Sequence, residues 1–410
     1  MKWEKVRLGE LYSVHNGLSK GSKFFGTGYP FLSFSTVFNN FFIPDELTDL
    51  VQSNEKEQDN YSILRGDVFV TRTSETSDEL GMSCVALKDY PNATYNGFTK
   101  RMRPIDNNRV LPEYIGYYMR TPLFRGEFRA FSTMTTRASL KNEDLLGLTV
   151  ALPPVEVQKK IANILRHYDQ LIENNQKQIK LLEEAAQRLY KEWFVDLRFP
   201  GYENVDIING APEGWRKELI GDVFTTVLGG TPARSNAAYW GGDIPWINSG
   251  EVNNLRIMKE SECITELGLK KSSAKLMPKH TTVLAITGAT LGQVSYTEIE
   301  TCANQSVVGI IDENEVYSIY LYLYVSDKIW DIIGKATGGA QQHINKDIVM
   351  EYTIVLPDEN IIARLNAIVE PYFMKIANMY IQNTKLLEAR DRLLYKFMSG
   401  GLEVPRCTIE

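Results

Sequence analysis

One stretch decides the fold of this chain. Residues 154–194 read PVEVQKKIANILRHYDQLIENNQKQIKLLEEAAQRLYKEWF, and their apolar positions step by four and three, as on one face of a long helix. A heptad seam of this kind, with a polar interruption at Asn175, is typical of a coiled coil. At 1.5 Å per residue the helix is a rod of roughly 60 Å, which needs a partner helix to bury its seam. The seam consists of Ile161, Leu165, Tyr168, Ile172, Asn175, Ile179, Leu182, Ala186, Leu189 and Trp193.

A second stretch, residues 357–398, offers that partner helix because the same steps recur there. Counted from opposite ends, an antiparallel pair places Asn175 opposite Asn383, where a paired amide would fix the register. The alternative is a hydrated seam in which the two amides do not bond. Pro371 lacks an N–H and is expected to kink or break the second helix. The second seam consists of Leu365, Val369, Tyr372, Ile376, Met379, Asn383, Leu386, Arg390, Leu393 and Phe397.

The chain repeats itself after about half its length. Residues 3–12 return as residues 215–224, and Tyr29-Pro30-Phe31-Leu32 returns as Ile244-Pro245-Trp246-Ile247. Further matches keep the same order, which is the signature of an internal repeat. They join residues 66–70 to 281–285 and residues 138–142 to 342–346. The predicted organisation is a first globule (1–152), a first helical spacer (153–199), a linker rich in turn formers (200–211), a second globule (212–356) and a second helical spacer (357–402).

Each globule is expected to contain mostly short strands. Residues 67–71 and 282–286 are β-branched or aromatic runs bounded by turn formers. A helical patch follows in each globule, at residues 112–119 and 317–333, and its aromatic spacing favours core packing over a stacking surface. The predicted fold class is α+β: two repeated mixed α/β globules, each with a curled or barrel-like sheet, separated by a long antiparallel two-helix coiled coil.

Composition and charge restrict the class of protein. The 410 residues are 43% hydrophobic, enough for several domains with buried cores. Neither an apolar run long enough to span a membrane nor a secretory leader is present, and the scattered cysteines and histidines argue against a disulfide framework or a metal site. We therefore expect a soluble, cytoplasmic protein without a membrane partner or a metal. The net charge of −6 means that contact with a polyanion must use local basic patches.

Motifs for chemistry are missing from the sequence. It contains no G-x-x-x-x-G-K-[ST] phosphate loop, no G-x-G-x-x-G fingerprint after a strand and no N-P-P-[FY] tetrad. Two related globules held at a fixed separation would instead suit a repetitive linear ligand such as DNA. A coiled-coil scaffold or adaptor that joins two protein partners without DNA specificity stays open, as does an enzyme with an unrecognised site. Divergence between the globules disfavours the scaffold, and the lack of convergent acidic or histidine motifs disfavours the enzyme.

Several motifs resemble those of the specificity (S) subunit of type I restriction-modification enzymes. The resemblance covers essentially the whole chain, in the order target-recognition domain, spacer, target-recognition domain, spacer. It is weaker in the first globule, where Asn16-Gly17-Leu18 stands in place of the Gly-Gly-Thr-Pro loop. The motifs are GGTPARS at 229–235, YWGGDIPW at 239–246, GATLG at 288–292, ANQ at 303–305, QQHIN at 341–345, LPPVEVQ at 152–158 and WF at 193–194.

The resemblance implies a recognition subunit without catalysis. Each domain would read one part of a split, asymmetric site in double-stranded DNA, and the chain would bind two methyltransferase (M) subunits. S-adenosylmethionine would belong to the M subunits, which flip and methylate an adenine. ATP and Mg would belong to a restriction (R) subunit that cleaves unmodified DNA. No cofactor is expected in this chain.

The candidate DNA contacts come from basic patches and from loops. For any one patch, a solvated surface is the usual alternative. Glycines in the 229–235 loop would let the backbone approach DNA, and its polar side chains offer donors, although an ordinary hairpin loop is the alternative. Glutamines could bond adenine or simply tie loops together. The candidates are Lys20, Lys23, Arg72, Thr73, Lys100, Arg101, Arg103 and Arg137 in the first globule, and Thr231, Arg234, Ser235, Asn236, Gln293, Gln305, Gln341 and Gln342 in the second.

Overall fold

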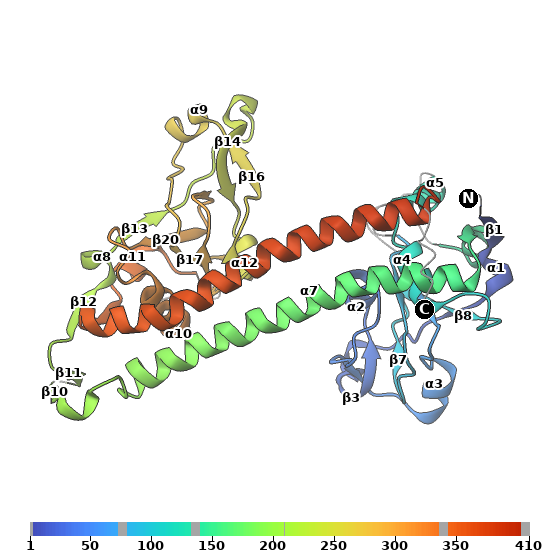
Figure 1. Cartoon of the computed structure of the whole chain (residues 1–410), viewed down its shortest axis with the longest axis horizontal. Helices are drawn as coiled ribbons and strands as arrows, with labels where there is room; N and C mark the ends of the chain where they lie inside the picture. Colours follow the sequence, from blue (N-terminus) through green and yellow to red (C-terminus); the bar gives the residue numbers. More distant parts are fainter. Residues whose placement is uncertain (1–2, 73–79, 133–139, 209, 336–342, 403–410) are drawn as a thin grey trace, which may run out of the picture. The chain divides into compact units, whose positions relative to one another are not determined.

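The computed structural model describes residues 3–72, 80–132, 140–208, 210–335 and 343–402. The chain forms two compact units: unit 1 is Met1–Ile172 with Lys385–Glu410, and unit 2 is Glu173–Thr384. Two long helices, α7 (Val155–Tyr190) and α12 (Glu359–Met398), each contribute to both units and are green and red in Figure 1. Each unit is described by itself below.

Unit 1 is built on an antiparallel sheet with the strand order β2-β8-β5-β6. Beside it lie a sheet ordered β4-β3-β7 and the pair β1-β9. Its elements are β1 (Glu4–Arg7), α1 (Leu8–Leu11), β2 (Tyr12–Asn16), η1 (Ser22–Phe24), β3 (Phe25–Leu32), α2 (Phe34–Asn39), β4 (Leu50–Val51), α3 (Glu55–Asn60), β5 (Val68–Thr71), β6 (Ser83–Val85), β7 (Thr94–Tyr95), β8 (Thr99–Pro104), α4 (Pro112–Tyr118), α5 (Pro122–Ser132), α6 (Asn142–Gly147) and β9 (Thr149–Leu152).

Unit 2 has a larger main sheet, ordered β13-β20-β17-β18-β15, beside a sheet ordered β16-β14-β19. The pairs β12-β21 and β10-β11 complete it. Its elements are η2 (Lys191–Val195), η3 (Tyr202–Asn204), β10 (Ile207–Ile208), β11 (Ala211–Pro212), β12 (Arg216–Leu219), α8 (Ile220–Val223), β13 (Thr225–Leu228), η4 (Ala237–Tyr239), β14 (Trp240–Ile247), η5 (Glu251–Asn253), β15 (Arg256–Ile257), β16 (Glu262–Ile264), α9 (Glu266–Lys270), β17 (Thr282–Ala285), η6 (Gly288–Thr290), β18 (Val294–Thr297), β19 (Cys302–Ala303), β20 (Val307–Ile311), α10 (Ser318–Gly334), α11 (Lys346–Met350) and β21 (Thr353–Leu356).

The two units repeat one pattern of strand pairing. The order β2-β8-β5-β6 of unit 1 returns as β13-β20-β17-β18 in unit 2. The parallel pair β3-β7 aligns Phe31 with Thr94, and the parallel pair β14-β19 aligns Trp246 with Cys302, as the match between residues 29–32 and 244–247 requires. Instead of one curled or barrel-like sheet, however, the described strands of each globule form several small open sheets, so that part of the prediction is wrong.

One sequence match is also wrong, by a single residue. Thr71 pairs with Thr99 in unit 1, and Ala285 holds the same position in unit 2, where it pairs with Val307. Thr71 is therefore the equivalent of Ala285, whereas the sequence match had aligned Val70 with Ala285. Both strands, β5 and β17, are buried along their whole length, so they lack the alternation of polar and apolar residues that would fix a register.

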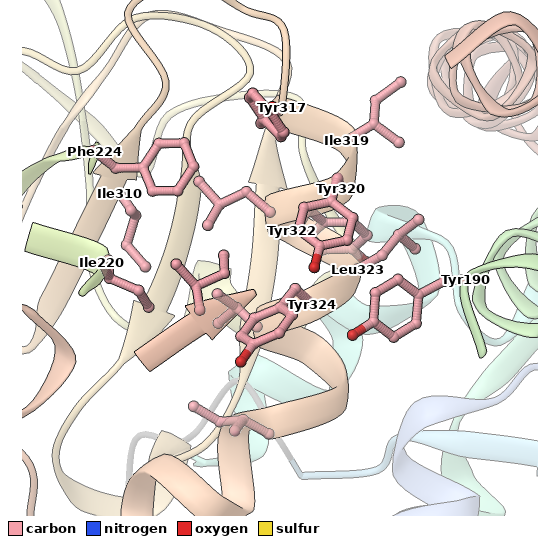
Figure 2. Close-up of a cluster of buried hydrophobic side chains, with 14 of the residues drawn as sticks. Tyr190, Ile220, Phe224, Ile310, Tyr317, Ile319, Tyr320, Tyr322, Leu323 and Tyr324 are labelled. Carbon is pink, nitrogen blue, oxygen red and sulfur yellow. The ribbon is translucent and has the colours of Figure 1, made fainter. Parts of the chain in front are cut away.

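Tyrosines of the α10 helix, with Tyr317 just before it, form part of the largest core cluster of unit 2 (Figure 2). Tyr317 and Tyr324 donate their hydroxyls to the carbonyls of Pro357 and Thr353, at 3.0 and 2.8 Å. Tyr320 donates to Val355 in the same way. The rings fill the core while the hydroxyls find backbone acceptors, as buried tyrosines require. The prediction that this patch is core is confirmed for its tyrosines, whereas Trp330 is 67% exposed.

In unit 1, the start of α7 packs against the end of α12. Ile161 and Leu165 belong to the same apolar cluster as Phe397, with Leu393 partly buried against it. Beside this cluster, Nη1 of Arg390 lies 2.6 Å from Oδ1 of Asp169, and the hydroxyl of Tyr117 donates to the other carboxylate oxygen.

In unit 2, the rest of α7 meets the first part of α12. Ile179 packs against Ile376 and Met379, with Leu182 partly buried beside them. The remaining seam residues of this unit are buried or half-buried: Ala186, Leu189, Trp193, Leu365, Val369 and Tyr372. Nδ2 of Asn175 donates to Oδ1 of Asn383 at 2.9 Å, so the two seam amides are hydrogen-bonded.

The α12 helix continues through Pro371, so the predicted break is absent. A proline inside a helix removes one backbone donor, and the carbonyl four residues earlier, that of Ala367, loses its usual partner. The apolar seam on either side of Pro371, at Val369 and Ile376, is fully buried. We attribute the continuity of the helix to this burial, because tertiary packing supplies most of the stability of helices in proteins.

Unit 2 also buries a cation between its globule and both long helices. The side chain of Arg256 on β15 is 0% exposed, and its Nη2 lies 2.6 Å from Oε1 of Glu183 on α7. Its guanidinium carbon is 4.0 Å from the ring centre of Phe373 on α12. Oε1 of a second carboxylate, Glu298, lies 3.6 Å from Nε. This ion pair therefore links the globule to the helices in one place.

Candidate nucleic-acid interface

Polar side chains gather in unit 1 where several elements end or begin. The β2 strand ends at Asn16, β5 ends just before Arg72, and α6 begins at Asn142. Their side chains surround an open cavity of about 590 Å³, which Arg72 and Lys100 share with a further cation, Lys141. The full lining is Asn16, Arg72, Lys100, Leu140, Lys141, Asn142 and Glu143. Two of the predicted DNA contacts thus lie together in a cavity with a net positive charge.

The cations of this cavity lack acidic partners of their own in the described part of the chain. Nζ of Lys100 donates to the neutral amide of Asn142, and burial together with the charge of Arg72 lowers the pKa of Lys100. Nε of Arg72 is buried and has no hydrogen-bond partner among the described residues. An anion in the cavity would relieve both effects, because a nearby negative charge stabilises the charged form of a base.

An exposed aromatic side chain stands next to the basic cavity. The backbone N–H of Arg72 donates to the carbonyl of Phe98 at 3.0 Å, and the side chain of Phe98 is 59% exposed. An exposed ring beside cations can stack on an unpaired or splayed base. Sequence reasoning missed Phe98 because a lone aromatic in a turn has no periodic pattern. It also missed Asn16, Lys141 and Asn142, which come together only in the fold.

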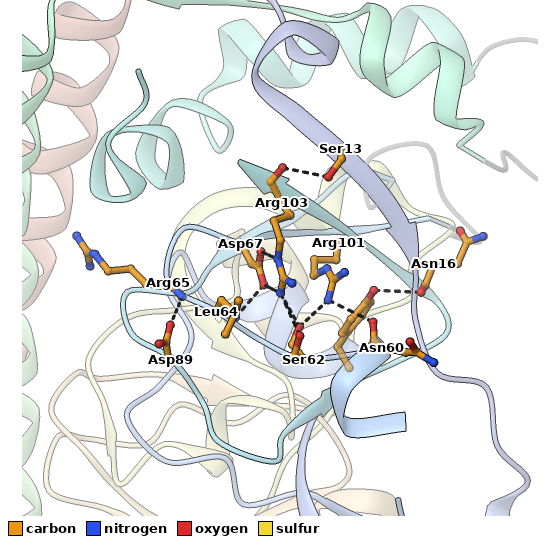
Figure 3. Close-up of polar contacts among 11 residues, drawn as sticks. Ser13, Asn16, Asn60, Ser62, Leu64, Arg65, Asp67, Asp89, Arg101 and Arg103 are labelled. Atoms are coloured by element: carbon orange, nitrogen blue, oxygen red, sulfur yellow. Dashed lines mark hydrogen bonds and ion pairs between the residues drawn. The ribbon is translucent and has the colours of Figure 1, made fainter. Parts of the chain in front are cut away.

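Arg101 and Arg103, two of the predicted DNA contacts, both have partners within unit 1. Figure 3 shows Arg103 bound to Asp67, with Nε–Oδ1 and Nη2–Oδ2 distances of 2.8 and 2.6 Å. Arg101 is 4% exposed and donates to the carbonyl of Ser62 at 2.7 Å. Asp67 is completely buried, so the strand needs a cation beside it, and the two arginines stabilise the interior of the sheet.

The two predicted lysines at the start of unit 1 are placed differently from each other. Nζ of Lys20 binds Oε2 of Glu57 at 2.7 Å, and this hydrogen bond, with one from the backbone of Asn54, lowers the pKa of Glu57. Lys23 is exposed, and its Nζ lies 5.1 Å from the ring centre of Phe24. Lys23 therefore stays available to a ligand, while the charge of Lys20 is already neutralised.

The glycines of the 229–235 loop let parts of unit 2 approach one another closely. A Cβ at Gly229 would clash with the carbonyl oxygen of Asn304, and one at Gly230 would clash with Ser273. These glycines let three loops of unit 2 approach one another, so their smallness is used inside the protein. Oγ1 of Thr231 bonds Oε1 of Gln305 at 2.5 Å, which joins two of the predicted contacts.

Arg234 is held in place by its neighbours. Its two terminal nitrogens bind the carboxylate of Glu262 at 2.7 and 2.8 Å, and its guanidinium lies 3.7 Å from the ring centre of Trp240. The hydrogen bond from Arg234 lowers the pKa of Glu262. Asn236 caps the turn that follows by accepting from the N–H of Ala238. Arg234 and Asn236 thus stabilise the loop, and their remaining donors face solvent.

The other predicted residues of unit 2 lie at loop positions. Ser235, Gln293 and Gln305 are exposed. Thr73, Arg137, Gln341 and Gln342 lie outside the described residues. Trp246 is buried in the core, and Trp240 packs edge-on against it at 5.2 Å.

Neither a metal centre nor a membrane span is found in the part of the chain that the structure describes. No group of three or more His, Cys, Asp or Glu side chains there could hold a metal ion. None of the helices in the same ranges is both long and apolar enough to cross a membrane.

Comparison with known proteins gives one consistent family. The chain is similar to the MjaIX specificity subunit of a type I restriction enzyme from Methanocaldococcus jannaschii, with 23% identity over 98% of this chain and 94% of that protein. It is 26% identical to the HindI specificity subunit of Haemophilus influenzae, over 98% of this chain and 99% of the relative.

A solved structure shows the same fold. The S subunit of a type I restriction-modification system from M. genitalium aligns with a TM-score of 0.55 and 14% identity, over 97% of this chain and 96% of that chain. The family model described as the type I restriction modification DNA specificity domain matches residues 1–184 and again residues 212–379. These two matches cover more than half of the chain and fall on its two repeats, so the chain belongs to the type I restriction modification DNA specificity family.

Proposed function

We propose that this chain is the non-catalytic DNA sequence-recognition subunit of a type I restriction-modification complex. Its two repeated globules would act as target-recognition domains, each reading one part of a bipartite, asymmetric site. The observation that carries the proposal is the duplication itself: one strand order occurs in both units, and the family model matches both repeats. Two copies of one fold with different surface residues are suited to reading two different sequences.

The basic cavity of unit 1 is the first candidate for contact with DNA. Arg72 and Lys141 offer donors to phosphate oxygens or to the O6 and N7 atoms of guanine, and Lys100, which is only 6% exposed, adds positive charge behind them. The unpartnered Nε of Arg72 supports this role, since buried donors are normally satisfied. Phe98 would lie against a base at the rim. Lys23, which is exposed, would add a phosphate contact.

In unit 2 the proposed contacts are the exposed polar residues of neighbouring loops. Ser235, Gln293 and Gln305 have side chains in solvent. Thr231, Arg234 and Asn236 would hold the loop that presents Ser235. The four predicted residues outside the described ranges, Thr73, Arg137, Gln341 and Gln342, remain proposed contacts.

The long helices would form an antiparallel two-helix coiled coil that holds the domains. Three observations support this within single units. In unit 2 the Asn175–Asn383 hydrogen bond and the packing of Ile179 on Met379 follow the expected pairing. In unit 1 the clustering of Ile161 with Phe397 does so as well. We retain the domain boundaries 1–152, 153–199, 200–211, 212–356 and 357–402 as part of the proposal.

Catalysis would belong to partner proteins. Two M subunits would bind this chain and methylate adenine with S-adenosylmethionine, and R subunits with ATP and Mg would cleave unmodified DNA. The relatives are named as specificity subunits of such enzymes. This division of labour agrees with the lack of catalytic motifs in the sequence.

The proposal is tested by selecting bound sequences from random DNA with the chain and its methyltransferase. We expect two fixed base clusters separated by a spacer of variable sequence. The Arg72→Ala variant should relax one cluster and leave the other unchanged, because only unit 1 is altered. Lys56→Ala, which removes an exposed charge from α3 of the same unit, is the matched control. Recovery of no consensus from the wild-type complex would reject the proposed function.

A further inference from the structure

A cavity of about 470 Å³ lies in unit 2 between the main sheet, the start of α10 and the α12 helix. Its charged lining consists of three carboxylates and one histidine: Glu298, Glu315, Glu370 and His280. Two aromatic rings, those of Tyr296 and Phe373, form part of its wall. We call it the acidic cavity. Because its negative charge repels phosphate, the acidic cavity is not one of the proposed DNA contacts.

Two polar atoms of the acidic cavity lack partners. Ser318 is 5% exposed, and its Oγ has no hydrogen-bond partner in the described part of the chain. Oδ1 of Asn366 is likewise buried and unpartnered among those residues. Both atoms can accept a hydrogen bond, and buried polar groups without partners need an explanation. A donor that enters the cavity would satisfy them.

The rim of the acidic cavity adopts an unusual backbone. His280 has φ of 65° and Glu315 has φ of 55°, a region that costs a residue with a side chain about 1 kcal/mol or more. The equivalent position in unit 1, before β5, is Gly66, which adopts this region freely. In unit 2 this position is His280, whose ring stacks on the ring of Tyr296 with a centre-to-centre distance of 5.5 Å. Nδ1 of His280 lies 3.5 Å from Oε1 of Glu315.

The surface around the acidic cavity has the character of a protein-binding site. Met374 and Ile381 on the same face of α12 are 55% and 45% exposed. Across α12, a second groove of about 580 Å³ shares Met374 and Asn378 with the acidic cavity. A small free amine would need only the cavity, whereas exposed apolar side chains and an adjoining groove fit a macromolecular partner.

We propose that the acidic cavity receives a lysine or arginine side chain of a methyltransferase subunit, so that it is a docking pocket for that partner. This inference rests on the proposed function. Glu370 and Glu315 would pair with the entering charge, because Glu298 and the ring of Phe373 already contact Arg256. Ser318 and Asn366 would accept its remaining hydrogen bonds. Met374 and Ile381 would pack around the stem of the entering side chain.

The pocket belongs to unit 2 and has a different counterpart in unit 1. Leu152 in unit 1 pairs with Glu4, and Leu356 in unit 2 pairs with Arg216, so the two leucines are equivalent residues of the repeat. Counting on from these leucines, the residue of α7 that corresponds to Glu370 is Arg166. The two units therefore differ in charge at this helix position, so we expect two identical methyltransferase subunits to bind the chain with unequal affinity.

The test measures uptake of the methyltransferase by the full-length chain, using native mass spectrometry for stoichiometry and calorimetric titration for affinity. Glu370→Lys should weaken one of two binding events by about tenfold or more and leave mainly one methyltransferase per chain. Glu370→Gln should have a smaller effect in the same direction. Glu313→Lys makes the same charge change at an exposed position near Glu315 and should leave both events unchanged. Thermal unfolding of each variant checks that the fold is intact.

Equal affinities for Glu370→Lys and Glu313→Lys would overturn the docking pocket, and so would a wild-type chain that takes up no methyltransferase. The proposed function is checked separately in the wild-type complex, by mapping methylated adenines. A complex that forms through the pocket but methylates no defined motif would refute the proposed function and leave the docking result standing.

Discussion

Glu183→Gln is the most informative single change to the stability of unit 2. It removes the charge that faces Arg256, whose side chain is 0% exposed, while Glu183 itself is 8% exposed. The pair depends on charge rather than on a well-aligned hydrogen bond, since Nη2 of Arg256 and Oε1 of Glu183 have no hydrogen-bond partner in the described structure. Breaking a buried ion pair by removing one partner costs about 3–5 kcal/mol. Glu298, at 3.6 Å, would offset a part of this cost.

The assay is urea unfolding followed by hydrogen exchange and mass spectrometry, which reads peptides of each unit separately. With a urea dependence of about 2–3 kcal/mol per M for a domain of this size, the unit 2 midpoint should fall by about 1–2 M. The unit 1 midpoint should stay unchanged. Glu184→Gln is the control, because its side chain is 42% exposed and its ion pair with Arg188 spans 3.8 Å, so we expect a change within about 0.5 kcal/mol.

A second variant tests the cause of the destabilisation. Replacing both partners, by Arg256→Met with Glu183→Leu, removes the two charges of the pair and should recover a part of the lost stability, because Glu298 loses its contact with Arg256 at the same time. A unit 2 midpoint for Glu183→Gln that equals that of Glu184→Gln would refute the reasoning. So would a double variant that is less stable than Glu183→Gln alone.

Three further predictions concern the helices, the stability of unit 1 at low pH and the DNA contacts. Replacing Asn175 and Asn383 together by leucine should raise the thermal stability of unit 2 but permit other helix registers, seen as bimodal hydrogen exchange in peptides of the two helices; a single exchange population would contradict the role of the pair. The pKa of Glu57 is lower in the folded state than in the unfolded state. Ionised Glu57 therefore stabilises unit 1 fully above its unfolded-state pKa, and this stabilisation is lost as the pH falls through its folded-state pKa. In the Glu57→Gln variant the stability of unit 1 should therefore fall less between about pH 5 and pH 3 than in the wild type. The same loss of stability in both proteins over this pH range would reject the prediction. Phe98→Ala should weaken DNA binding by the methyltransferase complex about tenfold, in line with the loss of one stacked base; unchanged affinity in a filter-binding titration would exclude stacking.

The helices and the repeat could be predicted because their signals are long. A seam that recurs over ten turns, or a match that spans half a chain, averages out local exceptions such as Pro371. The Asn175–Asn383 bond was one of two alternatives from the seam, since counting positions gives a register but not a hydrogen bond. The alignment of β5 with β17 could not be predicted in this way. Both strands are buried at every position, so their sequences match equally well when shifted by one residue.

The candidate site was harder to predict because charge in a sequence does not show what neutralises it. Arg101 and Arg103 read as a basic patch, yet Asp67 and the carbonyl of Ser62 lie against them only in the folded sheet. Lys100, one residue away, lies at the basic cavity. Gly229 shows the same limit, because the neighbour that requires its smallness is a distant loop and not a ligand.

The central claim, that the two repeats each read one part of a split DNA site, is tested most directly by mapping adenine methylation. The chain would be co-expressed with its methyltransferase, and the methylated positions located by single-molecule sequencing of random DNA. We predict a single bipartite motif, one half of which changes when residues 212–356 are exchanged for those of a relative. A methylating complex whose motif does not change in that exchange, or one without any defined motif, would contradict the account.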